Sequence, residues 1–377
     1  MVVDIRKADD ARDLVHRAVQ ALAEGRLVVF PTETVYGVAA SALCADAVRR
    51  LAKIKGRKAG HPFALAVKSA EDALDYVPDL SPLGQRLARR LWPGPVTLVF
   101  DCEHPNSLLH KLDPDVREAV APGGKTIGLR VPAHSVILDV LRLSCGPLAL
   151  TSANISGEAD STTAEQVAQS LGDDIALLFD DGPSRYGQSS TVVRVEGNDW
   201  TILREGVVTE RNLLRFASMM ILFVCTGNTC RSPMAETVFR ALVAQRMGCK
   251  VEELEDRGVV VASAGIAAFS GSPATPEAVE VMKAGGMDLS QHESQPLTEQ
   301  LVRQADHVFV MTRAHLDALL GEWPQAADRA KLLCRDGGEV ADPLGRPLEH
   351  YQRTAEQMKA SITEWIDELD FDQTGRD

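Results

Sequence analysis

The feature that most constrains what this chain can fold into is a polar loop midway along it. The loop contains a cysteine and lies between a predicted strand and a predicted helix. The apolar run at 221–224 predicts a buried strand, residues 225–232 form the loop, and Pro233 stands where a first helical position is expected. Strand and helix patterns alternate from there to a last helix over about 351–369. This alternation predicts a doubly wound α/β domain with a parallel sheet over residues 219–377.

The loop has the spacing Cys-x5-Arg-Ser. Because it precedes a helix, its backbone N–H groups can turn inward and form an anion site that the helix dipole reinforces. The same positive field favours the thiolate form of Cys225, Arg231 offers paired donors to two phosphate oxygens, and Ser232 can donate to the sulfur. Supporting positions in the same loop are Thr226, Gly227, Asn228, Thr229 and Cys230.

A thiolate that attacks phosphorus needs a proton donor for the leaving group, and Asp342 before Pro343 places a carboxylate on a loop. The alternative is a buried cysteine with an ordinary Asp-Pro turn. Cys230 closely follows Cys225, which allows either a reversible disulfide between them or a small packed side chain at 230. The pattern therefore predicts phosphoryl transfer through a cysteine, with Asp342 as the candidate acid.

The second half resembles the low-molecular-weight protein-tyrosine-phosphatase family at three stretches, 224–236, Ser263-Ala264-Gly265 and Asp342-Pro343. The resemblance implies that a phosphorylated protein is hydrolysed through a cysteinyl-phosphate. Cys225 would be the nucleophile and Arg231 the phosphate clamp. Asp342 would act first as the acid and then as the base for the attacking water.

Two positions in this half differ from tyrosine-specific members of that family. Leu344-Gly345 follow the Asp-Pro pair where aromatic residues usually wall the slot for a phenyl ring, and Thr229 replaces a bulky aliphatic residue. Thr229 and the run after Asp342, with His350-Tyr351 and Thr354, resemble the protein-arginine-phosphatase branch. We therefore favour phosphoarginine over phosphotyrosine as the substrate.

Two other functions stay open for the second half. A thioredoxin-coupled arsenate reductase needs a further cysteine pair, and the remaining candidates Cys249 and Cys334 lie far apart in the sequence. A degenerate phosphatase fold that serves as an interaction module is the second alternative. The intact Cys225, Arg231 and Asp342 disfavour it.

The first half also alternates helices and strands. It opens with apolar residues at helical spacing over 11–22, a buried strand over 27–30 and a loop over 31–37. Closely spaced strand candidates at 191–195 and 201–203 indicate a mixed α/β sheet and not a purely parallel one. The other candidates are strands at 63–67, 96–100, 126–131, 148–150 and 176–179, and helices at 81–91 and 163–171.

Polar residues gather at the predicted strand ends of this half. Hydroxyl groups together with Lys and Arg at such positions suit an anionic ligand such as a nucleoside triphosphate. The sequence has no Gly-x4-Gly-Lys-Ser/Thr motif, so any ATP site is not a P-loop. The candidates are Thr34, Lys55, Arg57, His61, Arg130, Ser152, Asn154, Ser190 and Arg204.

A series of motifs in order resembles the YrdC family of L-threonylcarbamoyladenylate synthases: Pro31-Thr32-Glu33-Thr34-Val35-Tyr36-Gly37, Lys55-x-Arg57 with Pro62, Trp92-Pro93-Gly94-Pro95-Val96-Thr97, Arg130-Val131-Pro132, Ser152-x-Asn154 and Ser190-Thr191. The resemblance implies a twisted mixed α/β sheet around a concave positive site. The implied reaction joins L-threonine, bicarbonate and ATP, with Mg²⁺ on the triphosphate, into threonylcarbamoyl-AMP and pyrophosphate. A downstream threonylcarbamoyl transferase would use the product to modify adenosine 37 of tRNA.

The resemblance also implies residue roles in the first half. Thr34 and Arg130 would hold L-threonine, with Arg130 pairing its carboxylate. Some relatives contact threonine with a histidine a few residues after the Lys-x-Arg loop, whereas Ala66 stands there in this chain. No metal held by the protein is implied. The ATP and carbamate site is assigned to Lys55, Arg57, His61, Ser152, Asn154, Ser190 and Arg204.

Two alternatives remain for the first half. A carbamoyl-transfer domain of hydrogenase-maturation proteins shares the fold, but those proteins carry zinc-finger regions and this chain has no Cys-x2-Cys pattern. A double-stranded-RNA-binding module that uses the positive concavity would have no enzymatic activity. Formation of a threonine-dependent adenylate separates these alternatives from the synthase.

Charge and composition bound the remaining possibilities. We expect a synthase domain over 8–210, a short linker over 211–218 and a phosphatase domain over 219–377. Residues 1–216 hold 25 Lys+Arg and 28 Asp+Glu, a net of −3 out of the formal −13, so the first half can still contact tRNA.

No apolar run approaches the roughly 18 residues of a membrane span, and the N-terminus is too polar for a signal peptide. Because the seven cysteines do not resemble a disulfide framework, we expect a cytosolic bifunctional enzyme without membrane contact.

Overall fold

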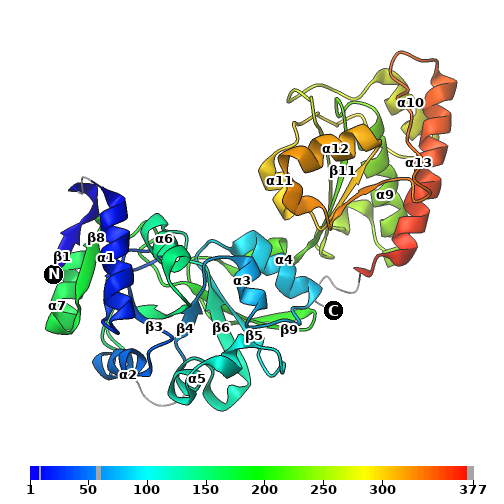
Figure 1. The fold of residues 1–377 in the computed structure, drawn as a ribbon. Coiled ribbons are helices and arrows are strands. Elements are labelled where there is room, and N and C mark those ends of the chain that lie inside the picture. Colours follow the sequence, from blue (N-terminus) through cyan, green and yellow to red (C-terminus); the bar gives the residue numbers. More distant parts are fainter. Residues whose placement is uncertain (8–9, 57–60, 372–377) are drawn as a thin grey trace. The chain divides into compact units, whose positions relative to one another are not determined.

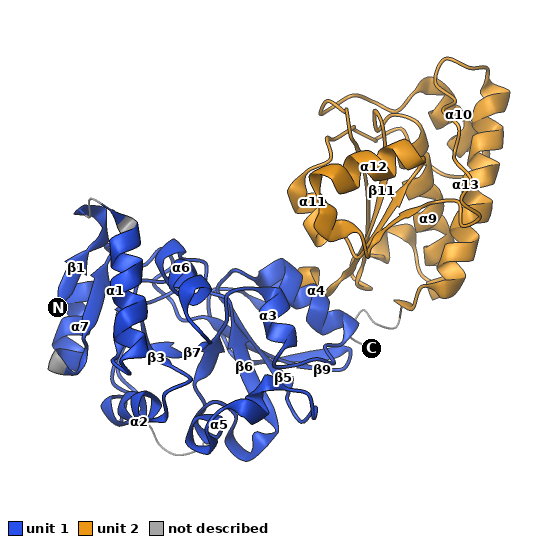
Figure 2. Cartoon of the chain, viewed as in Figure 1, with its two compact units in different colours: residues 1–213 blue, residues 214–377 orange. Residues whose placement is uncertain are grey.

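The computed structural model describes residues 1–7, 10–56 and 61–371. The chain divides into two compact units, Met1–Leu213 and Leu214–Asp377 (Figures 1 and 2). Within the described ranges, no helix has both the length and the apolar composition needed to cross a bilayer. Each unit is built on a β-sheet of its own.

The first unit contains one ten-stranded sheet (Figure 1). Its strands are β1 (Val2–Asp4), β2 (Val28–Phe30), β3 (Gly37–Ser41), β4 (Ala64–Ala66), β5 (Val96–Asp101), β6 (Thr126–Arg130), β7 (Leu148–Ser152), β8 (Leu177–Asp180), β9 (Thr191–Glu196) and β10 (Asp199–Arg204). They lie in the order β1-β8-β2-β3-β7-β4-β6-β5-β9-β10. β9 and β10 form an antiparallel hairpin while β5 runs parallel to β9, which confirms the predicted mixed sheet.

Helices of the first unit pack on this sheet. They are α1 (Ala11–Ala23), α2 (Ala45–Ile54), α3 (Ala70–Leu74), α4 (Pro82–Leu91), α5 (Pro114–Val120), α6 (Ser135–Leu143) and α7 (Ala164–Leu171). Helices α1 and α6 pack against each other, and Leu14, Val28 and Ile137 belong to one apolar cluster beneath them. Short 3₁₀ helices lie at Ile5–Lys7, Leu108–Lys111, Pro122–Gly124 and Gly172–Asp174.

The second unit contains a four-stranded parallel sheet with helices on both faces (Figure 1). Its strands are β11 (Met219–Cys225), β12 (Val259–Gly265), β13 (His307–Val310) and β14 (Ala330–Leu332), in the order β12-β11-β13-β14. Its helices are α9 (Arg231–Met247), α10 (Pro276–Ala284), α11 (Glu299–Gln304), α12 (Arg313–Glu322) and α13 (Leu348–Glu368), with 3₁₀ helices at Val251–Glu253 and Pro324–Ala326. This arrangement confirms the predicted doubly wound parallel sheet.

Side chains of β11 alternate between two apolar layers. Phe223 and Cys225 join the cluster that contains residues of α9 and α13, whereas Leu222 and Val224 join the cluster under α11 and α12. Because successive side chains of a strand point to opposite faces, β11 must be apolar throughout to serve both layers. The alternation also decides that Cys225 ends the strand on the side where α9 begins.

Several predicted boundaries differ from the structure. Helix α9 begins at Arg231, so Pro233 occupies its third position, which is tolerated because the N–H groups of a first turn lack helical acceptors. The segment 211–218, predicted as a linker, lies mostly in helix α8 (Glu210–Ala217). Strands β1, β3 and β14 were not predicted. β3 is short and unpatterned, and its antiparallel pairing with both β2 and β7 makes it a strand.

We expect Phe309→Ala to weaken the core of the second unit by about 3–5 kcal/mol, the usual range for a buried phenylalanine. Phe309 is buried between Phe223 and Trp365, with ring centroids 5.7 and 4.9 Å away. Hydrogen exchange of the β11 and β13 amides would measure the loss. Phe269→Ala, at a side chain that is 84% exposed, is the matched control and should change exchange by less than about 0.5 kcal/mol. Equal effects of the two variants would contradict this account of the core.

Candidate active sites

The candidate phosphate loop of the second unit joins β11 to α9. Cys225, the last residue of β11, is 2% exposed, and α9 begins at Arg231, so residues 226–230 form the loop. Gly265 ends the neighbouring strand β12, where a Cβ atom would lie 2.5 Å from the carbonyl oxygen of Thr226. The close approach of the loop to β12 therefore requires glycine at this position.

The sulfur of Cys225 has two polar neighbours at the start of α9. The backbone N–H of Asn228 donates to Sγ at 3.3 Å, and the hydroxyl oxygen of Ser232 lies 3.0 Å from Sγ. Both contacts lie at the start of α9, where the N–H groups of a helix N-terminus favour a bound anion. The structure thus brings the predicted nucleophile and the predicted sulfur donor into contact.

Asn228 holds the loop in shape. Its φ of 55° makes it the one non-glycine residue with positive φ in the part of the chain that is described. Its Nδ2 donates to the hydroxyls of Ser232 and Ser263, both at 2.9 Å, and its Oδ1 accepts from the backbone N–H of Gln295 at 2.8 Å. An asparagine tolerates this backbone conformation, and its amide group can donate and accept at the same time.

Arg231 and Asp342 are brought together although 111 residues separate them. Nη2 of Arg231 donates to Oδ2 of Asp342 at 2.6 Å, and Nη1 donates to the carbonyl oxygen of Val340 at 3.3 Å. The guanidinium is buried, whereas the carboxylate is 46% exposed. The predicted phosphate clamp and the predicted acid therefore lie in direct contact, with the acid on the solvent side.

Cys230 is buried, and its sulfur has two hydroxyl groups as neighbours. Its sulfur lies 3.4 Å from Oγ1 of Thr275 and 3.8 Å from the hydroxyl of Tyr351, and burial raises the pKa of Tyr351 to about 12. Thr229 beside it is half-buried. Both Cys225 and Cys230 are free thiols here, so a disulfide between them stays a prediction.

Two side chains near the loop are absent from the sequence-based prediction. His315 on α12 lies with Nε2 2.9 Å from Oγ1 of Thr226, which also accepts from Arg231 at 3.3 Å. Phe269 is exposed on the segment after β12, and Ala267 of that segment donates its N–H to the carbonyl oxygen of Thr226 at 2.9 Å. Neither residue lies in a motif, and His315 is 89 residues from Thr226, so no local signal pointed to it.

A cavity of about 260 Å³ lies over one face of the sheet in the first unit. On β5 and β6 alternate residues face it, because side chains of a strand point to one face at every second position. The sequence pattern predicted a site confined to the strand ends. In the structure the site extends across the face of the sheet instead. Its strand residues include Thr97 and Val99 of β5, Thr126, Gly128 and Arg130 of β6, and Leu150 and Ser152 of β7.

Arg130 ends β6 and lines this cavity while being only 7% exposed. Its Nη2 donates to Oε1 of Glu33 at 2.7 Å and to Oγ1 of Thr34 at 2.9 Å. Thr32 also lines the cavity, and its hydroxyl lies 2.8 Å from that of Thr34. The predicted pair of Thr34 and Arg130 is therefore in contact, and Thr32 and Glu33, which belong to the same sequence motif but have no predicted role, are additional members.

Arg204 and Ser190 line the same cavity. Nη2 of Arg204 donates to the carbonyl oxygen of Ser190 at 2.7 Å and to its hydroxyl at 3.0 Å. Desolvation lowers the pKa of Arg204, the negative charge of Asp160 opposes this, and the nearby positive charge of Arg130 adds to the lowering. The hydroxyl of Ser190 also lies 3.3 Å from that of Thr97. The buried Arg130 and the exposed Arg204 thus make the cavity positive, as expected for an anionic ligand.

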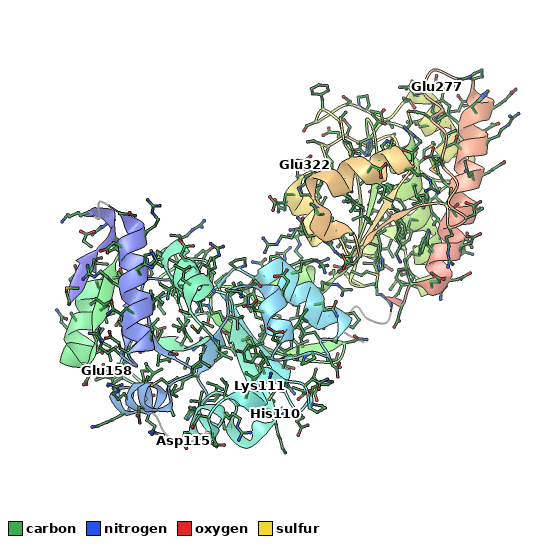
Figure 3. All side chains as sticks on the ribbon, viewed as in Figure 1. His110, Lys111, Asp115, Glu158, Glu277 and Glu322 are labelled. Atoms are coloured by element: carbon green, nitrogen blue, oxygen red, sulfur yellow. The ribbon has the colours of Figure 1, made fainter. Side chains whose placement is uncertain are left out.

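Lys55, Ser152 and Asn154 form one hydrogen-bonded group. Nζ of Lys55 donates to Oδ1 of Asn154 and to the carbonyl oxygen of Ser152, both at 2.8 Å. The hydroxyl of Ser152 donates to the same Oδ1 at 2.6 Å. Asn154 donates Nδ2 to the carbonyl oxygen of Glu158 at 2.7 Å; Glu158 is labelled in Figure 3. Ser152 reaches the cavity, and Lys55 and Asn154 support it.

Three of the predicted ATP-site residues, Lys55, Asn154 and His61, do not line the cavity. His61 is exposed and does not line it, although its neighbour Pro62 does. Arg57 lies outside the described residues. Among the residues that are described, no group of three or more His, Cys, Asp or Glu side chains could hold a metal ion. The cavity therefore offers cations and hydroxyls, which suit a phosphorylated or carboxylated ligand.

The two sites define a class before any relative is considered. One unit holds a buried cysteine in a loop that precedes a helix, and the other holds a cavity lined by Arg130 and Arg204. Residues 20–206 match the Sua5, YciO and YrdC family model, described as telomere recombination. Residues 220–374 match the model described as low molecular weight phosphotyrosine protein phosphatase.

Known relatives match the two units separately. Threonylcarbamoyl-AMP synthase of Pyrococcus abyssi is 38% identical over 183 residues, 48% of this chain and 51% of that protein, and the Bos taurus synthase is 34% identical over 205 residues, 52% and 70%. The structure of a YwlE arginine phosphatase from Geobacillus stearothermophilus is 34% identical and covers 41% of this chain and 95% of that chain, with a TM-score of 0.36. The chain spans about half the length of the first curated relatives it matches.

The chain belongs to the threonylcarbamoyl-AMP synthase family through its first unit, and its second unit is a low molecular weight phosphatase domain. Both are enzyme families, as the sequence motifs predicted.

We expect His315 to remain neutral to a lower pH than an ordinary histidine. Burial, and next the positive charge of Arg231, hold the pKa of His315 below 6.5. Because the folded pKa lies below the unfolded one, this histidine favours the folded state above pH 6.5, and the contribution is lost as the pH falls. An NMR titration of the imidazole, assigned with His315→Gln, measures the midpoint. Arg231→Met should raise it, and a wild-type midpoint above 6.5 would contradict the geometry described.

Proposed function

We propose that the second unit hydrolyses phosphorylated proteins through a cysteinyl-phosphate on Cys225. The observation that carries this proposal is the sulfur of Cys225 held 3.3 Å from the N–H of Asn228 and 3.0 Å from the hydroxyl of Ser232, at the start of α9. A sulfur in that field serves as a nucleophile, and the same N–H groups bind the oxygens of the transferring phosphoryl group.

The proposed reaction has two steps. The Cys225 sulfur attacks phosphorus and forms the S–P bond, while the bond from phosphorus to the leaving atom breaks and Asp342 gives that atom a proton. Water then attacks phosphorus, Asp342 accepts its proton, and the sulfur leaves as a thiolate that the Ser232 hydroxyl stabilises. Arg231 holds phosphate oxygens in both steps, so a bound phosphate takes over the donor that now contacts Asp342.

Within this function we favour phosphoarginine over phosphotyrosine. Thr229 is half-buried in the loop, and its hydroxyl gives a guanidinium N–H an acceptor that an aliphatic side chain could not provide. Leu344, which follows the Asp-Pro pair, is 60% exposed and offers no aromatic wall. The exposed ring of Phe269 does not discriminate, because a phenyl ring stacks on either a phenyl or a guanidinium plane.

We expect Cys225→Ser to reduce hydrolysis of both phosphoarginine and phosphotyrosine peptides by the full-length protein about 10⁴-fold or more, because the nucleophile is lost. Asp342→Asn should reduce it about 10²- to 10⁴-fold, the usual contribution of a general acid. Cys249→Ser, at a half-buried thiol outside the loop, is the matched control. Wild-type protein without activity on either substrate would instead support an interaction module.

The preference has its own test in the same assay. Thr229→Ile should lower kcat/KM for phosphoarginine about tenfold relative to phosphotyrosine. A tenfold change corresponds to about 1.4 kcal/mol, which is the contribution expected of one lost hydrogen bond. An unchanged ratio would remove the role assigned to Thr229.

We propose that the first unit makes threonylcarbamoyl-AMP from L-threonine, bicarbonate and ATP. The carrying observation is a cavity lined by Arg130 and by Arg204 with Ser190, which offers two cationic positions for a carboxylate and for phosphates. The threonine amine and bicarbonate form a carbamate with loss of water. A carbamate oxygen then attacks the α-phosphorus of ATP, and pyrophosphate leaves.

The chain's residues in this reaction bind and orient. Arg130 and Thr34 are proposed to hold L-threonine, while Arg204 and Ser190 neutralise charge on ATP. Ser152 contributes a hydroxyl, with Lys55 and Asn154 supporting it; Arg57 and His61 are kept as candidates for the phosphates. Mg²⁺ would enter with the ATP phosphates, and we assign it no residue. We further infer that a separate transferase uses the product on tRNA.

We expect Arg130→Lys to raise the KM for L-threonine about 100-fold, because an ammonium group cannot reproduce the planar donors of a guanidinium. The measurement is incorporation of radiolabelled bicarbonate into an adenylate by the full-length protein. Arg194→Lys, at an ion pair with Asp101 that does not line the cavity, is the matched control and should match wild type. If wild-type protein forms no threonine-dependent adenylate, an RNA-binding or carbamoyl-transfer role is favoured instead.

A further inference from the structure

The ion pair between Glu33 and Arg130 engages one nitrogen of the guanidinium and leaves another without a partner in the part of the chain that is described. Both protons of Nη2 on Arg130 are engaged, one by Oε1 of Glu33 at 2.7 Å and one by Oγ1 of Thr34 at 2.9 Å. Nε of Arg130 is buried and has no hydrogen-bond partner in the described residues. A buried donor without an acceptor is costly and rare, so a ligand acceptor is expected there.

Glu33 uses both of its oxygens. Oε1 accepts from Arg130, and Oε2 accepts from the backbone N–H of Ala133 at 2.9 Å. The carboxylate therefore ties the loop after β2 to the segment after β6, and it is only 8% exposed. A glutamine could not replace it, because an amide has one oxygen and would present an N–H to either Arg130 or Ala133.

Glu33 and Arg130 line different cavities. Arg130 lines the cavity of about 260 Å³ with Ser190 and Arg204, whereas Glu33 lines a separate cavity of about 390 Å³ with His134. Thr32 lines both. Glu33 therefore lies outside the cavity in which Arg130 meets a ligand, and it can act on that ligand only through the guanidinium.

We propose that Glu33 is a positioning residue for recognition of the substrate carboxylate. It occupies Nη2 of Arg130 and fixes the guanidinium plane, so that Nε and Nη1, unpartnered among the described residues, are the donors left for the carboxylate. This inference rests on the proposed synthase function. It adds that the binding of L-threonine, and not that of ATP, depends on the charge of Glu33, because Glu33 orients the free Nε and Nη1 donors of Arg130 toward the carboxylate of threonine.

The first test compares Glu33→Gln with Glu33→Asp in the full-length protein. Glu33→Gln should raise the Kd for L-threonine, measured by calorimetry, at least tenfold and leave the KM for ATP within twofold. Glu33→Asp keeps both acceptor oxygens and should recover part of the loss. Asp101→Asn breaks an exposed ion pair with Arg194 of similar length, 2.6 Å, and is the control that should leave both constants unchanged.

A purely structural ion pair gives a different result. In that case Glu33→Gln would lower thermal stability and weaken L-threonine and ATP equally, or would leave L-threonine binding unchanged, and either result overturns the proposal. If wild-type protein neither bound L-threonine nor formed the adenylate, the synthase function itself would be refuted. The two failures are thus distinguishable.

A second measurement needs no variant at Glu33 and decides the question if Glu33→Gln does not fold. The Nε–H resonance of Arg130, assigned with Arg130→Lys, should shift when L-threonine is added to wild-type protein. It should not shift with L-threonine amide, which has no carboxylate. A resonance that ignores L-threonine, or that responds equally to both compounds, overturns the proposal.

Discussion

A buried guanidinium needs a carboxylate beside it, and each unit builds its candidate site around one such pair. Arg130 lies 2.7 Å from Glu33, and Arg231 lies 2.6 Å from Asp342. Removing either carboxylate would leave the positive charge of a buried arginine uncompensated and out of water, which is among the most destabilising changes a protein can suffer. The strands and loops that carry these four residues are therefore constrained to meet.

The two pairs differ in how firmly the carboxylate is held. Glu33 is 8% exposed and its second oxygen is bonded to a backbone N–H, so it stays with its arginine. Asp342 is 46% exposed on a loop, so in the proposed phosphatase reaction a phosphate would displace it from Arg231 and leave it free to exchange protons. The same interaction thus suits a fixed carboxylate in one unit and, under that proposal, a movable acid in the other.

The sequence predicted the fold of both units well because their strands are apolar runs and their turns are marked. It also predicted the loop from Cys225 to Ser232, because that loop is one continuous segment between the end of a strand and the first residues of a helix. It failed for β3, whose strand character comes from neighbours on both sides, and for His315, which approaches Thr226 from another helix. Residue spacing carries no information on such contacts.

By itself the sequence determined two α/β units, a Cys-x5-Arg-Ser loop, and the residue types of an anion site in each unit. Only the tertiary structure decided that Asp342 meets Arg231, that Glu33 holds Arg130, and that the first cavity crosses a sheet face. The reason is physical. Local geometry follows from backbone conformation and helix dipoles, whereas burial of paired charges depends on which distant segments the sheets bring side by side.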